Sequence, residues 1–123
     1  AGDNTISGGA GDDQFFGSNG TDTLDGNGGF NYYSLNTSFG NAYTASLGAA
    51  DILLTDGAGM NTTLRNIQWI GGTSGGDTFN SGATARTLTL QGGAGTDTVS
   101  FSTETTAVTA NLGTTATGAF GTY

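Results

Sequence analysis

The strongest constraint on the fold is a nine-residue repeat in which glycine, an acidic or amide residue and a large apolar residue recur in step. The acidic or amide positions lie nine residues apart: Asn4, Asp13, Asp22 and Asn31. Glycine stands two residues before each of them, and a large apolar residue stands two after: Ile6, Phe15, Leu24 and Tyr33. Each unit is typical of a glycine turn and a short strand with its middle side chain pointing inward. One unit cannot bury that side chain alone, so the repeat predicts stacked units, a solenoid.

The composition limits what can stabilise such a stack. The 123 residues suit one domain and include 24 glycines but no cysteine, histidine or lysine. Disulfides and thiolate or imidazole metal sites are therefore excluded. The net charge of −8, with Arg65 and Arg86 as the only cations, argues against nucleic-acid or anionic-lipid partners and favours cation binding. Disorder is the competing interpretation, but the regular spacing of the aromatic residues argues against it.

The repeat divides the chain into four segments. It covers residues 1–34, lapses over residues 35–71 and returns over residues 72–100, where Arg86 occupies an aspartate position. We expect 35–71 to form linking strands of the same solenoid, although a short helix within 35–56 stays an alternative. Residues 101–123 are expected to add C-terminal strands, including one over 107–112, and a contact between subunits.

Stacking two units per coil places residues eighteen apart above one another, so Asp13 lies over Asn31 and Asn4 over Asp22. Stacked carboxylates without lysine repel one another, and glycine turns leave carbonyl oxygens without strand partners. A hard dication with six or more oxygen ligands solves both problems, and calcium fits better than magnesium. The alternative is ordinary Asx-turn chemistry without metal.

The repeat resembles the GGxGxDxUx nonapeptides of the RTX (hemolysin-type) calcium-binding family, where U is a large apolar residue. Residues 8–16 and 92–100 match this pattern at every position. The resemblance implies an all-β fold, a parallel β-roll or β-solenoid with calcium ions bound between stacked glycine-rich turns.

The resemblance also implies the calcium ligands, which are carbonyls and position-six side chains of two stacked turns. The three implied sites are Gly9, Gly11 and Asp13 with Gly26, Gly28 and Asn31; Gly2 and Asn4 with Gly17, Asn19 and Asp22; and Gly75 and Asp77 with Gly92, Ala94 and Asp97. Asparagine brings no charge and should weaken its sites, and Arg86 should exclude metal from its unit. The third pair is spaced by twenty residues, so a bulge must absorb two residues or the site fails.

Signs of catalysis are weak. Residues 72–76 match the GxSxG shape of a nucleophile elbow, but Ser74 has no histidine partner anywhere in the chain. An acidic pair such as Asp22 and Asp25 could suggest a glycosidase, yet the repeat already accounts for Asp22. Trp69 and Tyr32-Tyr33 suit core or capping positions better than a sugar platform. We expect no enzyme activity.

The repeat predicts a calcium-binding structural module, and the resemblance implies that it is secreted and lies at a bacterial cell surface. Its relatives by resemblance are exported unfolded by a type I apparatus and fold in external calcium. We expect calcium as a partner, together with self-association into a surface layer or filament, or continuation into a longer chain. The alternative is a non-catalytic module of a larger secreted enzyme or adhesin.

Overall fold

The computed structural model describes residues 2–35, 41–82 and 87–103, and these residues form β-strands joined by turns, without a helix. The strands are β1 Thr5–Ser7, β2 Gln14–Phe16, β3 Gly20–Asp25, β4 Tyr32–Ser34, β5 Thr44–Leu47, β6 Asp51–Thr55, β7 Met60–Arg65, β8 Trp69–Gly71, β9 Thr78–Ser81, β10 Thr89–Gln91 and β11 Thr98–Ser100. The all-β prediction is therefore confirmed. The helix considered within 35–56 is absent from its described part, which forms β5 and β6. No helix long and apolar enough to cross a membrane occurs in these ranges.

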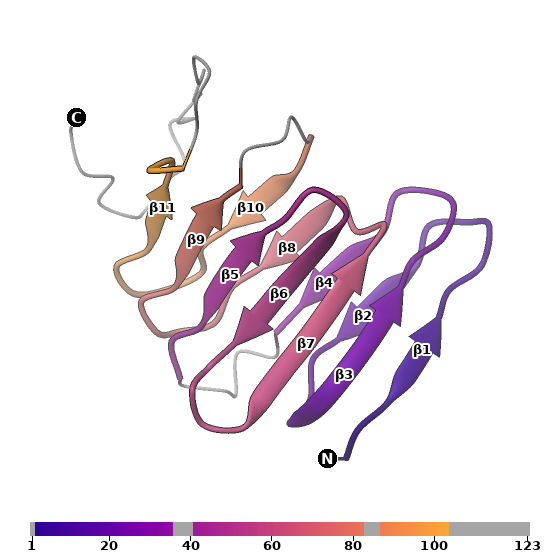
Figure 1. The fold of residues 1–123 in the computed structure, drawn as a ribbon, viewed down its shortest axis with the longest axis horizontal. Helices are drawn as coiled ribbons and strands as arrows, with labels where there is room; N and C mark the ends of the chain where they lie inside the picture. Colours follow the sequence, from indigo (N-terminus) through magenta and orange to yellow (C-terminus); the bar gives the residue numbers. More distant parts are fainter. Residues whose placement is uncertain (1, 36–40, 83–86, 104–123) are drawn as a thin grey trace.

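The strands form two facing sheets, which we call the front and rear sheets (Figure 1). The front sheet has seven strands in the order β1-β3-β7-β6-β5-β9-β11, and the rear sheet has four in the order β10-β8-β4-β2. The chain passes from one sheet to the other after each of β1, β2, β3, β4, β7, β8, β9 and β10. This alternation places successive glycine turns on the two edges of the sandwich.

Strands from successive coils pair in parallel with the predicted offset. Thr5 lies opposite Thr23 in the front sheet, and Gln14 lies opposite Tyr32 in the rear sheet. Both offsets are eighteen residues (23 − 5 and 32 − 14). The stacking predicted from the nine-residue count is therefore confirmed for residues 5–34.

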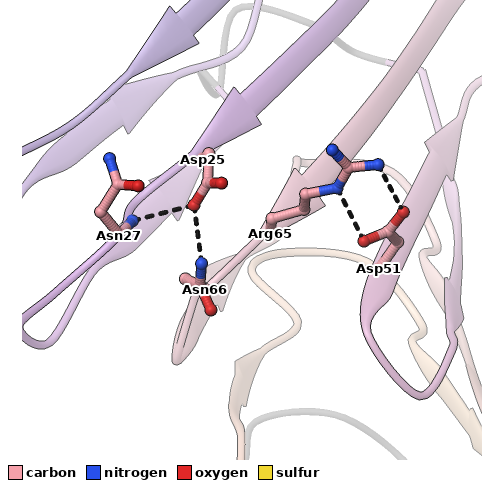
Figure 2. Close-up of polar contacts among 5 residues, drawn as sticks. All are labelled: Asp25, Asn27, Asp51, Arg65 and Asn66. Atoms are coloured by element: carbon pink, nitrogen blue, oxygen red, sulfur yellow. Dashed lines mark hydrogen bonds and ion pairs between the residues drawn. The ribbon is translucent and has the colours of Figure 1, made fainter.

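The predicted parallel β-roll or β-solenoid is not confirmed, because the front sheet is mixed. β6 pairs antiparallel with both β5 and β7, so these three strands form a meander between β3 and β9. The turn between Leu47 and Asp51 is too short for the crossover that a parallel pair requires, so β6 must run back along β5. An exposed, bidentate ion pair between Arg65 and Asp51 joins β7 to β6 at 2.9 and 3.0 Å (Figure 2).

The meander contributes several residues to the apolar core. Ala45, Ile52, Leu54 and Leu64 are fully buried, and Ile70 of the rear sheet belongs to the same buried cluster. Toward the end formed by β1 the core thins, and the inward position Ile6 is 44% exposed. The meander therefore adds hydrophobic stabilisation at the centre of the molecule that the terminal strand β1 lacks.

The paired tyrosines at the start of β4 have different environments. Tyr33 is fully buried, and burial raises the pKa of its phenol to about 12. Tyr32 points outward, with its ring 5.2 Å from that of Phe30 and 5.7 Å from that of Trp69. The expectation of a core position thus holds for Tyr33, whereas Tyr32 belongs to an exposed aromatic row. The C-terminal strand expected over 107–112 lies outside the described residues.

Candidate metal sites in the stacked turns

Two sets of turns join the sheets. The outgoing turns lead from the front sheet to the rear sheet and include residues 8–13, 26–31 and 66–68. The return turns lead back to the front sheet and include residues 2–4, 17–19, 72–77 and 92–97. Each predicted site lies between two turns of one set, so the fold brings together the halves of all three.

In each predicted site, the sixth residues of the two stacked nonapeptides are joined by a hydrogen bond, which we call a rung. The main-chain N–H of Asn4 donates to Asp22 Oδ1 at 3.0 Å, that of Asp13 to Asn31 Oδ1 at 2.9 Å, and that of Asp77 to Asp97 Oδ1 at 2.9 Å. The second residue of each pair thus directs a side-chain oxygen toward the turn before it. This common orientation is what a shared cation site between turns requires.

At the outgoing site, turn 8–13 stacks on turn 26–31. Gly28 N–H donates to the Gly9 carbonyl at 3.2 Å, and Asp13 Oδ2 accepts from Gly9 N–H at 2.7 Å. A β-carbon on Gly8 would touch Asp13 Oδ2 and would lie 2.9 Å from the Gly26 carbonyl oxygen. Two predicted ligand oxygens therefore converge where Gly8 has no side chain.

The role of Gly8 was missed in the set of predicted site residues, and Gly72 repeats it. A β-carbon on Gly72 would touch the Gly92 carbonyl and would lie 2.5 Å from Asp77 Oδ2. Both glycines occupy the first position of a nonapeptide. The signal was present in the motif, because glycine there leaves room for oxygens from two turns.

The remaining outgoing and return ligands also lie at turn-to-turn contacts. A β-carbon on Gly29 would touch the Gly11 carbonyl, and one on Gly95 would lie 2.6 Å from the Gly75 carbonyl. Both Gly29 and Gly95 have positive φ, 86° and 99°, which suits glycine and permits this close approach. The carbonyl oxygens predicted as calcium ligands therefore lie between turns rather than in solvent.

The twenty-residue spacing does not disrupt the site between turns 72–77 and 92–97. Trp69 lies opposite Thr89, and Thr78 lies opposite Thr98, so the offset is twenty on both sides of the turns (89 − 69 and 98 − 78). Ala94 N–H donates to the Thr73 carbonyl at 3.2 Å. The two additional residues therefore precede β10, and the expected bulge is not needed between these turns.

Asp77 is the most deeply buried carboxylate of the described residues, with 0% exposure. Its oxygens accept from Thr73 N–H at 2.7 Å, Thr73 Oγ1–H at 2.9 Å and Tyr43 N–H at 3.0 Å. Burial raises the pKa of Asp77 above its ordinary value of 3.8, and the charge of Asp97 adds to the rise, although these hydrogen bonds oppose it. In the metal-free protein the stability contributed by this group is therefore lost as the pH rises from 3.8 through its folded pKa.

The first return site differs from the other two. Asn4 Nδ2 donates to the Gly2 carbonyl at 2.6 Å and to Asp22 Oδ1 at 3.0 Å, so an N–H group already lies between two predicted ligands. Ser18 Oγ donates to Asp22 Oδ2 at 3.1 Å. The Asn19 carbonyl accepts from Gly2 N–H at 3.3 Å, and Gly17 N–H donates to the Ser34 carbonyl at 3.0 Å. Protein donors thus occupy much of this junction.

The donor chemistry suits calcium at the Asp13 and Asp77 junctions. Each offers carboxylate, carbonyl or amide oxygens from two turns, which are the ligands that a hard dication takes. No group of three or more acidic side chains able to hold a metal occurs in the described ranges. An ion at either junction would therefore depend on main-chain carbonyls as well as on side chains.

Stacked nine-residue turn-and-strand units with inward carboxylates define a repeat protein built around its turns. Residues 1–33 and 89–102 match the family model of the RTX calcium-binding nonapeptide repeat, in four copies. The chain therefore carries RTX calcium-binding repeats, as the resemblance indicated. Turn 72–77 lies outside the matched residues although it stacks on turn 92–97. None of the curated proteins matches the chain.

Proposed function

We propose that this protein is a secreted structural module that folds when calcium binds between its stacked turns. The observation that carries the proposal is Asp77, a carboxylate with 0% exposure whose N–H neighbours do not overcome the effect of burial on its pKa. Leaving such a charge without a cation is costly, because burial favours the neutral form. Calcium between turns 72–77 and 92–97 would remove that cost.

The residues that would hold calcium come from two junctions. At the outgoing junction they are Gly9, Gly11 and Asp13 with Gly26, Gly28 and Asn31; at the return junction they are Gly75 and Asp77 with Gly92, Ala94 and Asp97. Ions bound there cross-link coils whose side chains contribute little core. Because the folded state alone assembles these oxygens, binding free energy becomes folding free energy.

Dependence of folding on calcium also agrees with export of the chain before it folds. At low calcium the net charge of −8 and the conformational entropy of 24 glycines both oppose folding. In such a chain the stacked turns toward the two ends stay unordered until calcium is present, which agrees with secretion before folding is complete. We propose an extracellular location on this ground, with the RTX repeats as further support.

A calcium titration followed by circular dichroism tests the proposal. We expect a gain of β signal with calcium and none with equal magnesium, and we expect Asp13→Asn to raise the calcium midpoint about tenfold, or ~1.4 kcal/mol. Asp12→Asn is the matched control, since Asp12 lies next to Asp13 but uses one exposed oxygen, which accepts from Phe30 N–H at 2.7 Å and which an amide keeps. A full β signal in excess EGTA, or equal midpoints for the two variants, would contradict the proposal.

We also propose that the module continues by strand addition, either to copies of itself in a surface layer or filament or to neighbouring repeats of a larger secreted enzyme or adhesin. Among the strands of residues 2–35, 41–82 and 87–103, β1 has β3 as its one neighbour, and all three residues of β1 are exposed. Such a parallel edge is a template for another strand. We propose no catalytic role for the module itself.

Sedimentation velocity at rising protein concentration tests self-association. We expect species larger than the monomer in millimolar calcium and not in EGTA, because only the folded chain presents the β1 edge. A Thr5→Pro variant should remain smaller at each concentration, since proline on an edge strand blocks pairing. A calcium-loaded protein that stays monomeric throughout would leave continuation into a longer chain as the surviving alternative.

A further inference from the structure

We propose that Asn31 ends the ladder of cation sites along the outgoing turns, by placing its own amide N–H₂ where the next calcium ion would bind. This inference rests on the proposed function, since it concerns which junctions of the same ladder take metal. It assigns calcium to the junction between turns 8–13 and 26–31. At the next junction, turns 26–31 and 66–68 stack on one another without a calcium ion.

The amide of Asn31 has opposite chemistry on its two sides. Its Oδ1 accepts from Asp13 N–H at 2.9 Å, whereas its Nδ2 donates to the Asn66 carbonyl at 2.9 Å and to the Gly28 carbonyl at 3.2 Å. The partners are main-chain groups of fixed polarity, so they determine which end of the amide is oxygen. Asn31 is fully buried and held between them. It therefore offers an oxygen ligand to the preceding junction and a hydrogen-bond donor to the following one.

The following junction is complete without a cation. Gly26 N–H donates to the Arg65 carbonyl at 3.0 Å, Asn31 N–H to Gln68 Oε1 at 2.8 Å, and Gln68 N–H to the Asn31 carbonyl at 3.0 Å. Gln68 thus takes the rung position that Asn31 takes one coil earlier. Both rungs carry neutral amides, so no charge accumulates that would need a metal.

Asp25, the acidic residue nearest this junction in sequence, already accepts hydrogen bonds from two asparagines. Asp25 Oδ1 accepts from Asn66 Nδ2 at 2.7 Å and from Asn27 N–H at 2.9 Å (Figure 2). These two hydrogen bonds lower the pKa of Asp25. Asn27 and Asn66 both have positive φ, 57° and 52°, which asparagine tolerates and which orients their side chains back toward the preceding coil.

Asn4 follows the same rule on the return edge. It too is the first residue of its pair, and its Nδ2 donates to one predicted carbonyl ligand and one predicted carboxylate ligand. Asp77, in the equivalent place, accepts N–H groups and offers no donor. The amides of Asn4 and Asn31 therefore place a donor where a cation would bind, whereas the carboxylate of Asp77 places none. Of the three junctions predicted to bind calcium, this leaves two, at Asp13 and Asp77.

The Asn31→Asp variant tests the inference, with metal content per chain measured after gel filtration in calcium and thermal unfolding measured in EGTA. We expect one more calcium ion per chain than in the wild type, because the new carboxylate oxygen faces the Asn66 and Gly28 carbonyls. The same oxygen repels those carbonyls when metal is absent, so we also expect a lower melting temperature in EGTA. Asn61→Asp is the matched control, since Asn61 is exposed on β7 and gains the same charge away from the turns.

An Asn31→Asp protein with the wild-type ion count would overturn the inference while leaving the proposed function intact. A wild type that binds no calcium, beside a variant that binds one ion, would overturn the proposed function and the calcium assigned to the preceding junction, while still showing that the Asn31 amide keeps metal out of the following one. An extra ion in Asn61→Asp as well would show that added charge alone attracts calcium, and this outcome too would overturn the assignment to Asn31.

Discussion

An Asp77→Asn variant should lose stability in EGTA and should lose still more in calcium. Both oxygens of Asp77 accept main-chain N–H groups, from Thr73 and Tyr43, and the amide can offer oxygen to one of them at most. The other main-chain N–H then faces the amide N–H₂ group and stays buried without an acceptor. This lowers the free energy of unfolding by about 1–3 kcal/mol. With free calcium one hundredfold above the dissociation constant, losing the site removes up to about 2.7 kcal/mol more. Chemical denaturation with and without calcium measures both parts.

Asp56→Asn provides the control for this measurement. Asp56 Oδ1 accepts from Ala58 N–H at 2.8 Å and from Met60 N–H at 2.9 Å, and an amide oxygen can keep both bonds. The variant loses a long, exposed bond at 3.4 Å from Asn41 Nδ2 to Asp56 Oδ2. Its turn belongs to the meander and to none of the predicted sites. We therefore expect a change under about 1 kcal/mol that is equal in calcium and in EGTA. If Asp77→Asn kept the full wild-type increment on adding calcium, Asp77 would not be a ligand.

The nine-residue count was sufficient to predict the repeat strands and their stacking. It placed Phe15, Leu24 and Tyr33 on inward positions, and the structure buries all three. Local sequence was sufficient here because each unit carries its own turn, and glycine at fixed positions sets where the chain can bend. The same count did not extend to residues 35–71, where no periodic glycine marks the turns.

The antiparallel meander could not be derived from that stretch. Whether the chain crosses to the rear sheet after β5 or turns back depends on the short turn after Leu47, and its alternating apolar residues suit either path. Burial of Ile52 and Leu54 against Leu64 decides between the two, and this contact exists only after folding. Tertiary packing thus determined the topology where the local pattern was ambiguous.

The sequence also could not predict how the asparagine side-chain amides are oriented. An amide presents an oxygen and an N–H₂ group, and the repeat alone does not say which one faces the following turn. For Asn31 the deciding partner is the Asn66 carbonyl, thirty-five residues away, which becomes a neighbour only because β8 stacks on β4. The resemblance therefore indicated Asn31 as a ligand, while the fold shows that one side of it acts as a donor.

Chelation should remove order from the two ends of the molecule before the centre. The centre holds the fully buried residues of the meander and the amide rungs at Asn31 and Gln68, neither of which needs metal. Toward the ends, Ile6 is 44% exposed, and Leu90 and Val99 are only partly buried. We expect hydrogen exchange in EGTA to accelerate at least about 100-fold in peptides covering 5–16 and 89–100, equivalent to ~2.7 kcal/mol, and much less in peptides covering 44–71.

The calcium-loaded protein supplies the reference exchange rates, and magnesium-loaded protein controls for ionic strength. In Asn31→Asp the central peptides should join the calcium-sensitive group, because the variant exchanges an amide rung for one that needs metal. Uniform acceleration along the wild-type chain would mean that the ions hold the meander as well as the ends. The neutral rungs would then be insufficient to stabilise the centre, and the division of the molecule into metal-dependent ends and a metal-independent middle would be wrong.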